Sequence, residues 1–137
     1  LRKIELTTME DFEGYWIPRG WSRFGPIKLQ SRIDVPRSGT KVAAGRVGGG
    51  GVAWAPTLGL SAVELRVDDG PWQPATLGAV SSKETWAQWT TVWDATPGRH
   101  ILTVRATDGN GAVQTDRRAP PDPDGATGHH SIRFDVT

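Results

Sequence analysis

Hydrophobic and polar residues alternate along most of the chain after Ile27. From Ile27 to Val35, apolar or small side chains occupy every second position and polar side chains lie between them, as in a strand with one buried face. Segments with the same two-residue period follow at 63–68, 88–93, 100–106 and 131–136, and further extended segments are predicted at 72–77 and 112–115. Because no segment shows the 3.6-residue period of an amphipathic helix, the pattern predicts a chain built from strands.

Turn signals lie between these segments. Asp69-Gly70 predicts the positive φ angles of a tight hairpin turn between the strands on either side of it. Thr96-Pro97-Gly98 predicts a turn that makes a second hairpin of its two flanking strands. Asp108-Gly109-Asn110-Gly111 predicts a further reversal before residues 112–115.

Three segments break the regular pattern. A strand is predicted between Lys41 and Trp54, but Gly48 to Gly51 should interrupt it with a bulge or a flexible stretch. Residues 1–26 mix aromatic side chains with charges and have no sustained period, so we expect an irregular arm. Residues 116–130, rich in Pro and Asp, predict a loop.

The fold class predicted from these segments is all-β. About seven short strands with frequent turn signals indicate an antiparallel immunoglobulin-like β-sandwich of the E-set type. The sequence has no cysteine pair to join the two sheets.

Composition narrows the function classes. A length of 137 residues predicts one domain, and 16 Lys plus Arg against 15 Asp plus Glu leave a charge of +1, which makes nucleic acid an unfavoured partner. The absence of cysteine excludes a disulfide scaffold, a thiolate metal site and a cysteine nucleophile. The longest uncharged stretch is too weakly apolar to span a bilayer. Because the chain opens at Leu1, we expect it to be an excised piece of a longer protein. The compartment of that protein stays open, and an extracytoplasmic or membrane-associated parent is expected.

The three histidines do not form a recognisable catalytic or metal site. His100 follows a turn on a predicted strand, where a structural or solvent-facing role is expected. His129 and His130 are neighbours on an extended segment, so their side chains should point to opposite faces and cannot easily share a metal ion.

Two pairs of carboxylates and the glycine run are also candidates. Asp122 and Asp124 resemble a calcium loop only superficially, since further oxygen ligands are lacking, and a solvated turn is the better interpretation. Asp68 and Asp69 could be paired acids, but the hairpin turn already explains them. The glycine run lacks the Gly-Lys-Ser/Thr ending of a phosphate loop.

Seven tryptophans are the one compositional excess. Five of them lie within forty residues, and they could serve the core, a protein interface or a sugar-binding platform: Trp54, Trp72, Trp86, Trp89 and Trp93. No nucleophile, base and orienting group can be named together, so the residues predict no enzyme in this chain.

Several short motifs resemble one enzyme family. The chain resembles the carboxy-terminal part of the sulfite-oxidase family of molybdenum cofactor oxidoreductases, over residues 27–137, and residues 1–26 resemble the segment that leaves its catalytic domain. The motifs are Gly14-Tyr15-Trp16, Gly20-Trp21, Pro26-Ile27-Lys28, Gln30-Ser31-Arg32-Ile33, Gly51-Val52-Ala53-Trp54, Val63-Glu64-Leu65-Arg66-Val67-Asp68 with Gly70 and Trp72, and Trp93-Asp94-Ala95-Thr96-Pro97-Gly98.

The resemblance implies a non-catalytic dimerisation domain. Its partners would be a second copy of itself and its own catalytic domain. The polar strand faces that carry Arg66, Arg105 and Arg133 are candidates for the rim of the interface, and the period does not choose between the sheets. The chain itself would bind no cofactor, because the molybdenum and its molybdopterin would lie in the preceding domain. The resemblance also places Arg117 or Arg118 near that domain's anion-binding pocket; alternatively, both are solvated or pair with Asp116, Asp122 or Asp124.

Two other classes stay open beside this interpretation. One is a carbohydrate-binding or other immunoglobulin-like accessory module of an extracellular enzyme, which exposed tryptophans on one sheet face would favour. The other is a small enzyme in its own right, which the lack of a complete catalytic set disfavours.

Overall fold

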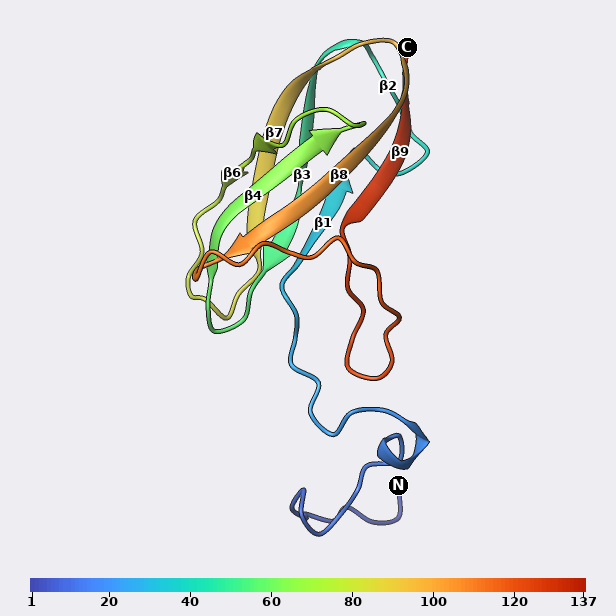
Figure 1. The fold of residues 1–137 in the computed structure, drawn as a ribbon, viewed down its shortest axis with the longest axis vertical. Helices are drawn as coiled ribbons and strands as arrows, with labels where there is room; N and C mark the ends of the chain where they lie inside the picture. Colours follow the sequence, from blue (N-terminus) through green and yellow to red (C-terminus); the bar gives the residue numbers. More distant parts are fainter.

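Two β-sheets pack face to face in the computed structural model, which describes residues 1–137 (Figure 1). Sheet A has the order β1-β3-β7-β6, with β1 at Gln30–Val35, β3 at Gly45–Trp54, β7 at Ala87–Ala95 and β6 at Thr76–Leu77. Sheet B has the order β2-β9-β8-β4-β5, with β2 at Lys41–Val42, β9 at His130–Val136, β8 at Gly98–Asp108, β4 at Leu60–Val67 and β5 at Gln73–Pro74. The predicted all-β sandwich is confirmed.

The core lies between the sheets and takes alternate residues from each. Its largest fully buried side chains are Trp89 from sheet A and Phe134, Leu102, Val63 and Val104 from sheet B. Burying each such side chain contributes roughly 1.5–3 kcal/mol. The alternation found in the sequence therefore corresponds to one buried and one solvent-facing side of each long strand.

The predicted interruption at the glycine run is wrong, because the strand continues through it. β3 continues through Gly48–Gly51 and pairs with β1 on one side and β7 on the other. A Cβ atom at Gly51 would lie 1.9 Å from the Arg32 carbonyl oxygen and 2.8 Å from Cζ2 of Trp89. A Cβ at Gly49 would lie 2.9 Å from Cζ3 of Trp93. These inward-facing glycines thus leave the space that the two indole rings fill.

The predicted hairpin around Thr96-Pro97-Gly98 is wrong. β7 belongs to sheet A and β8 to sheet B, so this turn carries the chain from one sheet to the other. The segments 41–54 and 72–77 likewise divide, each into two strands that lie in different sheets. A two-residue period reports which side chains are buried, and a change of sheet preserves it, because both sheets face the same core.

Four further local expectations are corrected. The first strand begins at Gln30 rather than Ile27, and residues 112–115 form only an isolated bridge between Val113 and Thr107. β2 pairs with β9 in parallel, which makes sheet B mixed. In the turn after β4, the positive φ angle is at Asp68, with a φ of 50°, rather than at Gly70.

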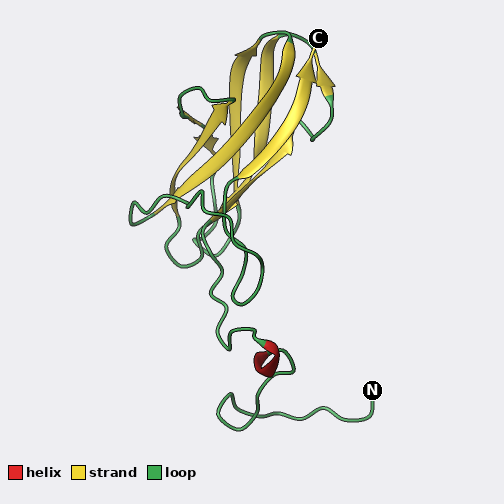
Figure 2. Ribbon diagram, turned by 45° about the vertical axis from the view of Figure 1, so that its right-hand side comes forward, coloured by secondary structure: helices red, strands yellow, loops and turns green.

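The arm extends away from the sandwich, and its one 3₁₀ turn spans Ile17–Arg19 (Figure 2). It is tied to the loop 116–130 where Ser22 N–H donates to the Pro123 carbonyl at 2.9 Å and where Lys28 pairs with Asp124 at 2.8 Å. Ten of the 17 exposed large apolar side chains lie between Leu1 and Ile27. No helix of the structure is long and apolar enough to cross a membrane.

Candidate functional site

His100 joins two turns at one end of the sandwich. Its Nδ1 lies 2.8 Å from Oδ2 of Asp68 and its Nε2 lies 2.8 Å from the Thr96 carbonyl oxygen. Only the doubly protonated ring can donate to both oxygens, and the hydrogen bond to Asp68, followed by that to Thr96, raises the pKa of His100. Partial burial acts to raise the pKa of Asp68, but hydrogen bonds from the Ile101 N–H and His100 bring it below its usual value. The pair is therefore a latch between turns, in line with the structural role expected for His100.

His129 and His130 engage different partners. The His129 Nε2 lies 2.9 Å from the Gln114 carbonyl, and its ring meets Trp72 edge to face. The His130 Nδ1 accepts a hydrogen bond from the Ile33 N–H at 3.0 Å, and burial lowers the pKa of His130. The structure contains no group of three or more His, Cys, Asp or Glu side chains that could hold a metal ion.

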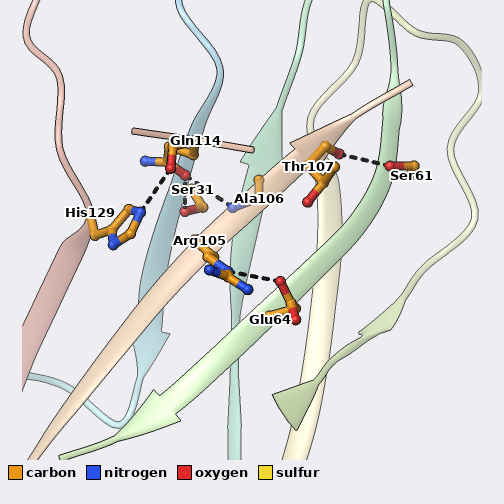
Figure 3. Close-up of polar contacts among 8 residues, drawn as sticks. All are labelled: Ser31, Ser61, Glu64, Arg105, Ala106, Thr107, Gln114 and His129. Carbon is orange, nitrogen blue, oxygen red and sulfur yellow. Dashed lines mark hydrogen bonds and ion pairs between the residues drawn. The ribbon is translucent and has the colours of Figure 1, made fainter. Parts of the chain in front are cut away.

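A buried amide that the sequence analysis missed links the two sheets. Gln114 accepts hydrogen bonds from the Ser31 hydroxyl at 2.6 Å and from the Ala106 N–H at 3.1 Å (Figure 3). Its Nε2 donates to the Gly128 carbonyl at 2.9 Å. Ser31 lies on β1 and Ala106 on β8, so one side chain from the loop joins sheet A to sheet B. An isolated glutamine gives no sequence signal for such a role.

The two carboxylate pairs do not converge on a common site. Asp124 is engaged by Lys28, whose Nζ also donates to the Gly125 carbonyl at 3.0 Å, while Asp122 is exposed in the same turn. Asp68 is engaged by His100, and Asp69 is exposed beside it. One carboxylate of each turn is held by a cation, and the other is exposed.

The five clustered tryptophans serve different surroundings. Trp89 is buried and Trp93 packs against Phe134, so these two belong to the core. Trp54 and Trp86 lie 5.3 Å apart, and Trp54 lines a cleft of about 420 Å³ at the end of the sandwich. The ring of Trp72 lies beneath two arginines that belong to strands of sheet B. No single aromatic platform is formed by all five.

The outer face of sheet A is balanced in charge. Its outward positions carry Arg32 and Arg46 against Asp34 and Asp94, and Arg32 pairs with Asp34 at 2.7 Å. Gly48 and Gly50 lie between these charged ends, and a Cβ atom at Gly48 would meet nothing within 4 Å. This face therefore has open space at Gly48, beside the exposed Val92 of β7.

The outer face of sheet B is strongly cationic. Glu64 pairs with Arg105 at 2.8 Å across β4 and β8 (Figure 3), and Asp135 pairs with Arg99 at 3.2 Å. Trp72 lies under two guanidinium groups, at 4.2 Å from Arg105 and 4.9 Å from Arg66. Four more cationic side chains on or beside this face form no ion pair: Lys41, Arg66, Arg118 and Arg133.

Arg118 borders this same face, whereas Arg117 is exposed on the loop. Arg118 lines a cleft of about 400 Å³ together with Arg133, Ser131 and Ser38. Neither Arg117 nor Arg118 forms an ion pair with a loop aspartate. The anion contact suggested for these two residues in a parent enzyme stays a prediction.

Comparison with known proteins places the fold among immunoglobulin-like modules. No protein-family model matches the chain, and no curated protein matches it. The sulfane dehydrogenase SoxCD from Paracoccus pantotrophus is similar with a TM-score of 0.62 and 21% identity, over 77% of this chain and 30% of that one. Fibronectin(III)-like modules of Clostridium thermocellum CbhA are similar with a TM-score of 0.51 and 18% identity, over 79% of this chain and 97% of that one. The chain thus spans less than a third of the SoxCD chain, and both likenesses establish its immunoglobulin-like fold.

Proposed function

We propose that this chain is a non-catalytic accessory domain that self-associates and supports a molybdopterin-dependent oxidoreductase resembling sulfite oxidase. The ordered motifs of the sequence support this role, and so does the likeness to part of a dehydrogenase chain. Molybdenum and its pterin belong to the separate catalytic domain in this proposal. The family resemblance implies an anion-binding pocket near the molybdenum of that domain.

The observation that carries self-association is the outer face of sheet A. Two-fold symmetry brings the same patch of each copy together, so a suitable patch must be complementary to itself. This face has charges of both signs at its ends and a glycine-lined centre that lets two backbones approach closely. The outer face of sheet B would instead oppose unpaired cations of the two copies, which is unfavourable.

A long charged side chain placed at the centre of each face tests this assignment. Gly48→Arg fills the open centre of sheet A without an internal clash, and Ser131→Arg places the same side chain on the exposed outer face of sheet B. Sedimentation equilibrium over a wide range of protein concentration should show a dimer for the unsubstituted chain and for Ser131→Arg, and a monomer for Gly48→Arg. The proposal is contradicted if the unsubstituted chain is strictly monomeric, or if the dimer is lost only in Ser131→Arg.

The anion contact is tested in the full-length parent. Arg offers a planar fork of donors that can bind two oxygens of one oxyanion. Replacing Arg117 or Arg118 by Ala should reduce kcat/KM for the anionic substrate roughly tenfold or more if that residue makes a charge-assisted contact. Lys83→Ala, whose side chain lies against Gly59 and outside the loop 116–130, is the control. Unchanged kinetics in both arginine variants would return the two residues to solvent.

A carbohydrate-binding module is the second candidate, and one observation favours it. Trp86 is 44% exposed and lies against Trp54 at the edge of the 420 Å³ cleft, where a sugar ring could stack. A pull-down on insoluble cellulose and other polysaccharides, with Trp86→Ala as the comparison, tests it. Retention that depends on Trp86 would favour this candidate over the first.

A further inference from the structure

The outer face of sheet B has a surplus of positive charge that self-association does not use. We propose that this face is a docking surface for an acidic segment of a partner protein. The proposal rests on the arrangement of arginines on β4, β8 and β9 and on the loop beside them, and it does not depend on how the chain self-associates.

The charge surplus survives the pairing of every carboxylate on the face. Glu64 and Asp135 are already taken by Arg105 and Arg99. Lys41, Arg66, Arg118 and Arg133 have no carboxylate within ion-pair distance. The whole chain has a charge of only +1, so this face concentrates positive charge that acidic residues balance elsewhere. Such a local field favours a complementary acidic surface and speeds its association.

The unpaired Arg66 and the ion-paired Arg105 both lie over the ring of Trp72 before any partner binds. Arg66 and Arg105 stack on Trp72, whose ring is fixed in turn by the edge of His129 at 5.5 Å. The Arg66 guanidinium makes no hydrogen bond within the chain, and its buried Nε has no acceptor. A stacked guanidinium loses less conformational freedom when it binds a carboxylate than a free side chain would.

Two further unpaired arginines lie on β9 and on the loop beside it, and β9 is two strands from β4. Arg118 and Arg133 border the 400 Å³ cleft, whose other polar side chains are Ser38 and Ser131. Thr103 on β8 lies in register between Arg66 on β4 and Ser131 on β9, and its hydroxyl is 2.9 Å from the hydroxyl of Ser131. Adjacent strands are about 4.8 Å apart, so β4, which carries Arg66, and β9, which carries Arg133, are separated by about 10 Å across the sheet. Two carboxylates of one polypeptide segment can reach across that distance.

Charge distinguishes an acidic polypeptide from the other occupants. A second copy would bring four unpaired cations against four more. Nucleic acid binding depends on releasing many counterions along a continuous cationic track, whereas this patch is small and includes two carboxylates. An acidic segment with a few carboxylates matches both the number and the spacing of the free arginines.

Fluorescence anisotropy with labelled poly-L-glutamate at low salt tests the proposal. The chain should bind this probe, and the double variant Arg66→Glu/Arg133→Glu should bind at least tenfold more weakly. Binding should also weaken steeply as salt is added. Arg133→Glu alone keeps the test valid if loss of the Trp72 stack disturbs folding, because the exposed Arg133 side chain makes no hydrogen bond or ion pair in the chain. Arg2→Glu, an equal charge change on the exposed arm, is the control and should bind as the parent chain does.

Three outcomes would overturn the proposal. They are no binding to poly-L-glutamate at low salt, an equal loss in Arg2→Glu and Arg133→Glu, and tighter binding to duplex DNA of comparable length than to poly-L-glutamate. Sedimentation of Arg133→Glu separates a loss of poly-L-glutamate binding from a loss of the proposed self-association, because the variant should keep the oligomeric state of the unsubstituted chain.

Discussion

The two sheets bury the same kind of core but present different surfaces to solvent. Sheet A exposes paired charges around a glycine-lined centre, and sheet B exposes arginines stacked on a tryptophan. A β-sandwich needs only its inner faces to fold, so its outer faces are free to differ. The two proposals above follow this difference in charge: a second copy is proposed for sheet A and an acidic partner segment for sheet B.

The inner faces differ as well. Sheet A places large indole rings over residues that lack side chains, whereas sheet B contributes mainly aliphatic side chains and Phe134 to the same core. Close packing requires the volumes of the two layers to be complementary. The bulk of Trp89 and Trp93 is therefore accommodated within sheet A itself, where Gly49 and Gly51 lie.

The largest effect is expected where the glycines of sheet A face inward. Gly51→Ala would place a methyl group 1.9 Å from a backbone oxygen of β1, which cannot move without breaking the sheet, so we expect a loss of about 3 kcal/mol or more in the free energy of unfolding. Urea denaturation measures it. Gly48→Ala, whose methyl group would meet nothing within 4 Å, is the matched control and should change stability by less than about 0.5 kcal/mol. Equal losses in both variants would show that backbone freedom, rather than space under Trp89, explains the glycine run.

The next effect concerns the bond between the sheets. Gln114→Leu removes the amide that serves Ser31, the Ala106 N–H and the Gly128 carbonyl, and it leaves these buried groups without partners. We expect a loss of about 2–3 kcal/mol, measured by thermal and urea unfolding. Gln73→Leu, an exposed amide on β5, is the control. A loss of the same size in Gln73→Leu would contradict the assignment of this stability to the buried hydrogen bonds of Gln114.

The smallest effect depends on pH and concerns the corner where sheet A continues into sheet B. Since the pKa of His100 is raised on folding, its contribution is complete below its ordinary value near 6.5 and is lost as pH rises through the raised value. The wild-type free energy of unfolding should therefore decline as pH rises above about 6.5, and His100→Gln should abolish that decline, which we expect to be about 1 kcal/mol or less.

His130 provides a contrast in the same experiment. Its pKa is lowered on folding, so its contribution is complete above its ordinary value and is lost as pH falls through the lowered value. His130→Gln should therefore flatten the acidic side of the stability profile and leave the alkaline side unchanged. An alkaline decline that persists in His100→Gln would contradict the latch between Asp68 and Thr96.

Much of the architecture could be predicted from local pattern. The period of two along residues 30–35, 63–67 and 131–136 identified strands with one buried face, because an extended chain directs successive side chains to opposite sides. The partner of each strand could not be predicted in the same way. β7 and β8 are joined by a short turn and still lie in different sheets, since either arrangement buries the same alternate residues.

The candidate surfaces divide in a similar manner. The sequence by itself determined which residues are present: 16 Lys plus Arg, a run of four glycines and no cysteine. Only the tertiary structure decided that Arg118 from the loop borders Arg133 of β9, that Arg66 and Arg105 share Trp72, and that Gln114 spans both sheets. These contacts join residues whose proximity follows from strand order and from loop paths, and neither leaves a local signal in the order of amino acids.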